Sequence, residues 1–344
     1  MKILSREFLP TTTPSVHAAT MAFFKGHPVH AWFGGSREGA PDVAIYLNNL
    51  NGDNKTIIIG GNDSIPRWNP ILMSIGDKLF LFTKAGLFCD RWQTFVYDIT
   101  NWTSNITNRE IAASANMLPA GLNGPTKTKP IIVDDNIYCG SSVETIYDWS
   151  SYEEIYRYHN KSFSFVSRSN PLFLKNKQVY QDFNGVTRSS LGVIQPSIWI
   201  DKDYNRHCFM RASRNLGKIY YSKYSCLSRE YSNVWDTPLP TNLPNPNSGI
   251  DTVYINDKLY LVYNPSETNR NPLVISQIDQ IGDTSEFEIK DTLIIKDEVV
   301  EKNPFISQEL SYPYCCKDEN GNINCIYTYG RFRIEKVVIS VENK

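Results

Sequence analysis

The stretch NDKLYLVY at residues 256–263 places a tight turn, Asn256-Asp257, directly before a short apolar run. Five other stretches have the same form, a turn-forming group followed at once by apolar residues. They are GHPVHAWF (26–33), GDKLFLF (76–82), DNIYCG (135–140), YNRHCFM (204–210) and NGNINCIY (320–327). Asn, Asp and Gly tolerate the positive φ that tight turns require, and β-branched or aromatic residues favour strands, so each stretch predicts a β-hairpin.

The six turns recur roughly every 50 to 70 residues, which is close to the period of one propeller blade. Six similar antiparallel units predict an all-β protein, a six-bladed β-propeller. A chain of 344 residues could make two domains, but repetitive β architectures run long as one unit, so we expect a single domain over residues 1–344. We expect the first strand to pair with the last blade, because this closes the ring and protects sheet edges.

Composition and charge narrow the classes of function. No long stretch has apolar residues at helical spacing, so little helix is expected. The formal net charge of −1 gives no positive field for nucleic acid. The N-terminal MKILSREFLP lacks the apolar core of a signal peptide, and no stretch has the length of a transmembrane span. We therefore expect a cytoplasmic protein that could reach a membrane only through a partner, and a second subunit is left open.

The cysteines predict free thiols. There are seven, at positions 89, 139, 208, 226, 315, 316 and 325. The number is odd, most of them lie in apolar β-like runs, and no metal-ligand spacing occurs, so buried thiols in a reducing compartment are expected. Neither a metal nor a nucleotide-binding motif is indicated, and no cofactor is expected.

The segment HAWFGGSREGAPDVAIY at 30–46 is the first place where chemistry is plausible. It predicts a strand, a Gly-Gly turn, a charged loop and a second strand, with Arg37, Glu38 and Asp42 at the mouth of the hairpin. In a propeller such loops gather at the axis. The alternative is that Arg37 and Glu38 form a solvated pair at a hairpin tip, which contributes little energy.

Six stretches distinguish these alternatives. They are 30–46, RWNP (67–70), GPTKTKP (124–130), QPS (195–197), NPNSGID (245–251) and YNPSETNRNPLVIS (263–276). Together, in this order, they resemble the sialidase superfamily, in its BNR-repeat-like branch. The resemblance implies a six-bladed propeller, in agreement with the count of turns. The family's repeat signature, Ser-x-Asp-x-Gly-x-x-Trp, is present only in degraded form at Ser228, Glu230, Ser232 and Trp235.

The resemblance implies four kinds of functional group. Arginines bind the carboxylate of the substrate, because the guanidinium fork matches a carboxylate bidentately and stays charged. A carboxyl group protonates the leaving oxygen. A tyrosine attacks the anomeric carbon, where a carboxylate nucleophile would be repelled by the sugar's own carboxylate, and a glutamate removes the phenolic proton.

Matching positions assign these roles to particular residues. Arg211 and Arg270 match two of the three clamp arginines, and Tyr312 matches the nucleophile. Glu38 matches the acid/base group, with Asp42 as the second choice. Arg37, Arg67 and Gln195 are further candidates for contact with substrate.

Two positions depart from the family pattern. His17, in PSVHAATMAF, lies where the first clamp arginine is expected, and Gln195 replaces the base that activates the tyrosine. A glutamine cannot accept a proton, so Tyr312 needs another activator. His17 is a candidate, because the ordinary pKa of histidine is near neutrality; the alternative is a structural histidine.

Other charged and aromatic residues are weaker candidates. Each of these positions has packing or solvation as its alternative explanation. They are Arg67 with Trp68, Arg91 with Trp92, Lys127, Lys129 and Glu144, and Arg331 with Arg333, which are expected to alternate on one strand and to face the same side.

The sequence thus predicts an exo-glycosidase that releases a terminal acidic sugar, an ulosonic acid such as sialic acid or Kdo, from an acidic glycan. Two alternatives remain. One is a polysaccharide lyase acting on a uronate-containing glycan, for which a neutral His or Tyr base and arginines would suffice. The other is a non-catalytic carbohydrate-binding propeller.

Overall fold

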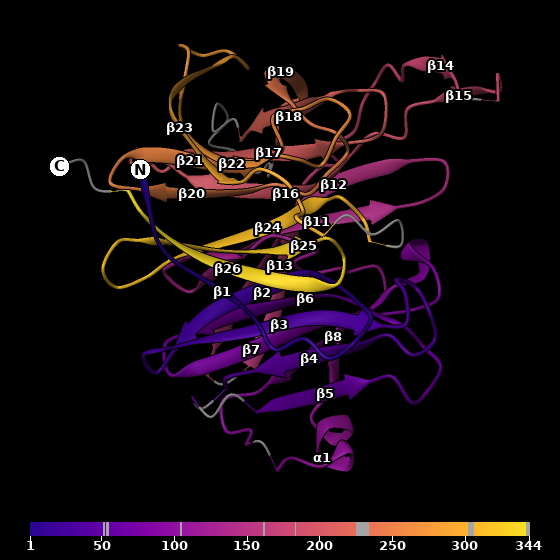
Figure 1. Cartoon of the computed structure of the whole chain (residues 1–344), viewed down its shortest axis with the longest axis vertical. Helices are drawn as coiled ribbons and strands as arrows, with labels where there is room; N and C mark the ends of the chain where they lie inside the picture. Colours follow the sequence, from indigo (N-terminus) through magenta and orange to yellow (C-terminus); the bar gives the residue numbers. More distant parts are fainter. Residues whose placement is uncertain are drawn as a thin grey trace. The chain divides into compact units, whose positions relative to one another are not determined.

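A computed structural model describes residues 1–50, 52, 55–103, 105–160, 162–182, 184–224, 234–301 and 306–341. These residues form six four-stranded antiparallel sheets and a two-stranded one, and the chain is a six-bladed β-propeller, as predicted (Figure 1). Within them, helix is limited to the 3-10 turn η1 (Cys89–Arg91) and to α1 (Asn108–Ala113). None of the described helices is long and apolar enough to cross a membrane.

The chain divides into two compact units, each with three of the six blades. Unit 1 comprises residues 1–129 and 298–344, and unit 2 comprises residues 130–297. The expectation of a single domain over residues 1–344 stays a prediction.

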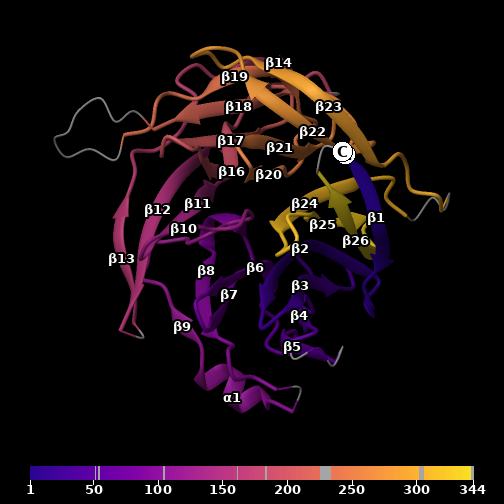
Figure 2. The same cartoon turned by 90° about the vertical axis from the view of Figure 1, so that its left-hand side faces the viewer.

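Unit 1 contains blades one, two and six. Blade one is β2 (Ser15–Phe24), β3 (His27–Gly35), β4 (Ala44–Asn48) and β5 (Thr56–Gly60). Blade two is β6 (Arg67–Ile75), β7 (Lys78–Ala85), β8 (Gln93–Asp98) and β9 (Asn116–Met117). Blade six is β24 (Leu310–Lys317), β25 (Ile323–Tyr329), β26 (Arg333–Ser340) and β1 (Lys2–Phe8). The indigo β1 pairs antiparallel with the yellow β26, which confirms the expected pairing of the first strand with the last blade (Figure 2).

Unit 2 contains blades three, four and five. Blade three is β10 (Ile131–Val133), β11 (Asn136–Glu144), β12 (Trp149–His159) and β13 (Ser162–Arg168). Blade four is β16 (Val193–Ile200), β17 (Arg206–Ala212), β18 (Lys218–Lys223) and β19 (Leu239–Pro244). Blade five is β20 (Asp251–Ile255), β21 (Lys258–Tyr263), β22 (Leu273–Gln280) and β23 (Phe287–Lys296). A hairpin of β14 (Val179–Gln181) and β15 (Thr187–Ser189) lies in the sequence between blades three and four.

The six predicted turns each join the first and second strands of a blade. Two-residue connections link β2 to β3, β6 to β7, β10 to β11 and β20 to β21. In blades four and six the connections have five residues, and an aspartate at the start of each accepts backbone hydrogen bonds. Asn205 N donates to Asp201 Oδ1 and Asn322 N to Asp318 Oδ1, both at 2.8 Å. Such Asx turns explain why Asp and Asn recur here.

The predicted Gly-Gly turn at Gly34 and Gly35 is wrong, because both glycines continue β3. They pair with Val16 and Ser15 of β2, and the loop begins at Ser36. A Cβ atom at Gly34 would lie 2.4 Å from Thr13 Oγ1, so close packing rather than a turn requires this glycine.

A bulge interrupts the first strand of four blades. Each contains a non-glycine residue with positive φ, namely Ala18 (51°), Asn69 (30°), Gln195 (56°) and Tyr312 (54°). The register shifts at the same places, between positions 17 and 20, 68 and 71, 194 and 197, and 311 and 314. Such bulges redirect side chains and are frequent beside active sites, and positive φ at non-glycine residues costs about 1–3 kcal/mol. Two of the four bulges lie at predicted site residues, Gln195 and Tyr312.

The described cysteines are free thiols, as predicted. Cys139, Cys208, Cys315 and Cys325 are buried, Cys316 is partly buried and Cys89 is exposed. Cys226 lies outside the described residues.

Candidate active site

Tyr312 lies against His17 in unit 1. The two ring centroids are 4.1 Å apart and the ring planes are inclined by 48°. His17 Nδ1 lies 2.9 Å from Thr328 Oγ1 of β25, and both rings are buried. The bulge at Tyr312 and the bulge that follows His17 therefore bring together a candidate nucleophile and a candidate base from two blades.

Lys127 is a second neighbour of Tyr312. Its ammonium nitrogen lies 5.8 Å from the centroid of the Tyr312 ring, and it donates a hydrogen bond to the carbonyl of Pro313. The Lys127 side chain is buried, so this residue of the GPTKTKP stretch is not a solvated loop charge. Lys129 lies 5.9 Å from the centroid of the Tyr314 ring.

Arg331 brings a guanidinium group to the same unit. Arg331 Nη1 donates to Glu38 Oε2 and Arg331 Nε donates to Glu309 Oε1, each at 2.5 Å. Ser311 Oγ also donates to Glu309 Oε1, at 2.7 Å. Burial alone would lower the pKa of the Arg331 guanidinium, but the charges of the two glutamates raise it above its ordinary value. Tyr312 contributes to the same upward shift of the pKa. Glu38, a predicted acid/base residue, is thus held in an ion pair.

The expectation that Arg331 and Arg333 share one face of a strand is wrong. Arg331 lies in the turn before β26 with a φ of 69°, and only Arg333 belongs to the strand. Arg333 Nη1 donates to Glu301 Oε1 at 3.1 Å, so the two arginines have different partners. The turn directs Arg331 toward β2, where Val16 N donates to the Arg331 carbonyl at 2.8 Å.

Asp42 organises the loop between β3 and β4. Ser36 N donates to Asp42 Oδ2 at 2.8 Å and Ser36 Oγ donates to Asp42 Oδ1 at 2.9 Å. These hydrogen bonds from Ser36 lower the pKa of the Asp42 carboxyl below its ordinary value. A carboxyl group that stays ionised is a poor proton donor, so these hydrogen bonds argue against Asp42 as the acid.

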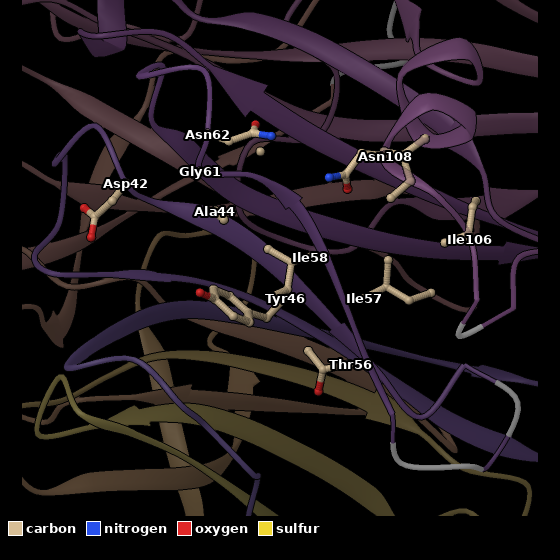
Figure 3. A pocket seen from close by; sticks show the side chains of 12 residues that line it. Asp42, Ala44, Tyr46, Thr56, Ile57, Ile58, Gly61, Asn62, Ile106 and Asn108 are labelled. Carbon is tan, nitrogen blue, oxygen red and sulfur yellow. The ribbon is translucent and has the colours of Figure 1, made fainter.

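Asp42 also lines a groove of about 470 Å³ along β4, β5 and the segment around α1. Figure 3 shows Asp42 at one end of this groove and Ile106 with Asn108 at the other. No lysine or arginine is among its lining residues. The groove therefore lacks the positive charge that an acidic sugar requires, and we do not place the predicted substrate there.

Arg67 is held by its own loop. Arg67 Nη2 lies 2.5 Å from Asp63 Oδ2, and Arg67 Nη1 donates to the carbonyl of Ile65 at 2.5 Å. Its guanidinium is therefore occupied by local partners. Arg37, by contrast, is exposed at the tip of the loop after β3.

The two tryptophans of the Arg-Trp pairs pack against each other. The ring centroids of Trp68 and Trp92 are 5.6 Å apart, and Trp68 Nε1 donates to the carbonyl of Gly86 at 2.8 Å. Gly39, in the loop that contains Glu38, contacts the Trp68 ring, since a Cβ atom there would lie 3.2 Å from it. These aromatic residues thus support the loop that positions Glu38.

In unit 2, Asn247 joins Arg211 and Arg270. Arg211 Nε donates to Asn247 Oδ1, and Arg270 Nη2 donates to the backbone carbonyl of Asn247, both at 2.8 Å. Asn247 has a φ of 59°, a conformation that asparagine tolerates better than most residues. The two predicted clamp arginines, from blades four and five, therefore meet at one residue.

Gln195 contacts Arg211 as well. Arg211 Nη1 donates to Gln195 Oε1 at 3.3 Å, and the guanidinium carbon lies 5.6 Å from the centroid of the Trp149 ring. Both Gln195 and Arg211 are buried. The amide oxygen of Gln195 accepts this hydrogen bond without carrying a negative charge of its own.

Comparison with known proteins shows the family of the chain. The BNR repeat-like domain family matches residues 26–325. The chain belongs to this family. No curated protein matches the BNR repeat-like chain by sequence.

Three solved structures are similar to this BNR repeat-like propeller. A protein of unknown function from Dyadobacter fermentans has a TM-score of 0.69 at 9% identity, over 99% of both chains. Trypanosoma rangeli sialidase in complex with sialic acid has a TM-score of 0.56 at 12% identity, over 95% of this chain and 54% of the sialidase. A subtype N10 neuraminidase-like protein of A/little yellow-shouldered bat/Guatemala has a TM-score of 0.54 at 9% identity, over 99% of both. The chain spans about half the length of the sialidase, and these likenesses show the shared fold.

Sequence reasoning missed the partners that orient the candidate residues of the BNR repeat-like propeller. Asn247 lies in the quoted stretch NPNSGID, and an asparagine between prolines and glycine signals a left-handed backbone position, but not its contact with two arginines. Glu309 and Thr328 have no local signal in the sequence that would predict their contacts.

Two further features named in the sequence analysis have these places in the structure. Glu144 ends β11 and is partly buried. Of the degraded repeat signature, Trp235 is buried, and Ser228, Glu230 and Ser232 lie outside the described residues.

Proposed function

We propose that the protein is an exo-glycosidase that releases a terminal ulosonic acid, such as sialic acid or Kdo, from an acidic glycan. The observation that supports this most directly is the meeting of Arg211 and Arg270 at Asn247. Two guanidinium groups held at one residue attract a carboxylate, and they stay charged at any working pH. Membership of the BNR repeat-like family, whose fold is shared by a sialidase, is consistent with this role.

The proposed mechanism assigns one role to each candidate. Arg211 and Arg270 bind the carboxylate of the sugar. Glu38 protonates the leaving oxygen, and Tyr312 attacks the anomeric carbon to form a covalent glycosyl-enzyme. Water then displaces the tyrosine with Glu38 as the base.

His17 is our candidate for the group that accepts the phenolic proton of Tyr312. It lies against the Tyr312 ring, whereas Gln195 has no proton-accepting carboxylate. Lys127 places a positive charge near the same ring, where it would stabilise negative charge on the phenol oxygen.

The replacement of the usual base by Gln195 favours one second candidate, a lyase acting on a uronate. In that reaction Tyr312 or His17 would remove a proton beside the carboxylate, and the arginines would hold the carboxylate. Hydrolysis and elimination would use the same fold and the same candidate residues.

A screen of acidic glycans tests both functions. Hydrolysis releases a saturated ulosonic acid, and elimination creates a conjugated double bond that absorbs in the ultraviolet. Release of free sialic acid or Kdo is the expected result. Saturable binding without any product would instead identify a carbohydrate-binding propeller, and the absence of both product and binding would exclude the proposal.

A further inference from the structure

Arg331 has two carboxylate partners, and they differ in how firmly they are held. Glu309 is the more buried, with 15% of its side chain exposed, and it also accepts a hydrogen bond from Ser311 Oγ. Glu38 lies in the loop between β3 and β4 with 41% of its side chain exposed. The backbone of Arg331 is fixed separately, by the hydrogen bond from Val16 N. Of the three groups, Glu38 is therefore the one that can leave.

The ion pair conflicts with the role of Glu38 as an acid. An ion pair with Arg331 requires the ionised carboxylate, whereas the donor of a proton must be the neutral carboxyl group. Glu38 cannot do both at the same time. Something must separate Glu38 from Arg331 before the leaving oxygen is protonated.

A ligand with a carboxylate can replace Glu38, because it offers Arg331 the same chemical group. Glu309, the second partner of Arg331, accepts a hydrogen bond from Ser311, the residue before Tyr312, so the guanidinium lies in the same part of blade six as the residue that would attack the sugar. His17, which the resemblance places at the position of the first clamp arginine, contacts the same tyrosine. Arg331 of blade six thus provides a guanidinium group in a blade other than that of His17.

We propose that Arg331 exchanges carboxylate partners when an acidic ligand binds. The ligand's carboxylate replaces that of Glu38 on Arg331, while Glu309 keeps the guanidinium in place. Glu38 then takes a proton from water and donates it to the leaving oxygen, so the acid is released only when an acidic sugar is present. This inference rests on the proposed function and adds a residue and a selectivity step to it.

Calorimetric titration of the full chain with two pairs of probes tests the exchange. The probes are free N-acetylneuraminic acid and free Kdo, each with its methyl ester, which lacks the negative charge. Glu38→Gln removes the competing carboxylate, so the free acid should bind about two- to fivefold more tightly than to the wild type, the strength of a partly exposed ion pair. The methyl ester should show no such gain. Arg331→Gln should weaken binding of the free acid at least about tenfold.

The matched control is Glu301→Gln, which breaks the neighbouring ion pair with Arg333. It should leave the affinity for the free acid unchanged. In the double variant Glu38→Gln with Arg331→Gln, the gain from Glu38→Gln should disappear. A gain in Glu301→Gln, or none in Glu38→Gln, overturns the exchange.

The failure of the exchange differs from that of the proposed function. If the acids bind the wild type but Glu38→Gln brings no gain in affinity, the exchange is wrong. The proposal that the protein binds an acidic sugar is then retained. If neither acid binds the wild type or Glu38→Gln, both the exchange and the proposed function are wrong. Should Arg331→Gln fail to fold, Arg331→Lys replaces it, and it should still weaken binding because an ammonium cannot form the fork-shaped contact.

Discussion

His17 of β2 and Tyr312 of β24 come from opposite ends of the chain, yet their ring centroids lie 4.1 Å apart, beside bulges in two different blades. In the sequence, His17 stands where an arginine was expected, and Gln195 stands where the base for Tyr312 was expected. The structure places the titratable ring of His17 against the phenol. This contact is the reason for assigning the proton of Tyr312 to His17.

Replacement of Tyr312 tests the nucleophile. Tyr312→Phe should abolish the covalent glycosyl-enzyme that a fluorinated substrate analogue traps, because the attacking oxygen is missing. His17→Gln should slow the formation of this adduct without abolishing it. Intact-protein mass spectrometry of the trapped adduct is the measurement.

The matched control for that test is Tyr314→Phe. Tyr314 lies two residues along β24, and its hydroxyl donates to the carbonyl of Leu72 at 3.3 Å. This variant should still form the adduct. Full activity in Tyr312→Phe, or inversion at the anomeric carbon in the wild type, would exclude a tyrosine nucleophile.

The two arginines of unit 2 should each contribute to the binding of a carboxylate. Arg211→Ala or Arg270→Ala should cost about 1.5–3 kcal/mol of binding free energy for an acidic sugar, the range for hydrogen bonds to charged groups. Arg→Lys at either position should not restore the affinity, because the bidentate contact is lost. Unchanged affinity in both alanine variants would rule out the clamp.

Asn247 should couple to one arginine through its side chain and to the other through its backbone. Asn247→Gly keeps the positive φ and the carbonyl that Arg270 contacts, but it removes the oxygen that Arg211 contacts. In double-mutant cycles of ligand affinity, Asn247→Gly should therefore be non-additive with Arg211→Ala and additive with Arg270→Ala within about 0.5 kcal/mol. The reverse pattern would show that the backbone contact dominates.

The blades were predictable from the sequence because each hairpin is encoded locally. Turn residues and the apolar runs that follow them, such as Asn256-Asp257 before β21, need no distant partner. Gly34 was misassigned because its requirement comes from Thr13, a contact that exists only after β2 and β3 have paired.

For the candidate site, the sequence motifs indicate single residues and not the contacts between them. Arg211, Arg270, Tyr312 and Glu38 were proposed from the resemblance, but their partners come from distant positions. Arg331 and Glu38 are separated by 293 positions, so no local pattern predicts their ion pair. The effect of a bulge on side-chain direction likewise depends on register between strands.

Buried His30 of β3 should make unit 1 sensitive to acid. Neither of its ring nitrogens has a hydrogen-bond partner among the described residues, and burial, with the charge of Lys336, lowers its pKa from 6.5 to about 4. Between pH 6.5 and pH 4, His30 is therefore protonated in the unfolded chain and neutral in the folded chain. Stability is therefore full above pH 6.5 and falls by about 3 kcal/mol as the pH drops to 4.

His30→Leu should remove this part of the decrease in the free energy of unfolding at acid pH. Urea unfolding at intervals from pH 7 to pH 4 measures it, and the exposed His159 provides the control as His159→Gln, which should leave the pH dependence as it is in the wild type. An unaltered acid slope in His30→Leu would contradict the assignment.

Buried Glu153 of β12 should have the opposite effect in unit 2. Arg206 Nε lies 3.1 Å from Glu153 Oε1 without hydrogen-bond alignment, and Trp235 Nε1 donates to Oε2 at 3.3 Å. Burial outweighs these attractions and raises the pKa of Glu153 from 4.5 to about 7. The folded state therefore favours the protonated carboxyl group.

The sign of this contribution follows from the two pKa values. Below pH 4.5 both states are protonated and nothing is lost. As the pH rises to 7 the unfolded chain releases a proton that the folded chain retains, so stability falls by about 3 kcal/mol over this interval. Glu153→Gln cannot ionise, so its stability relative to the wild type should rise by that amount between pH 4.5 and pH 8 in urea unfolding. A constant difference between the two proteins over this range would mean that Glu153 is ionised in the folded state and paired effectively with Arg206.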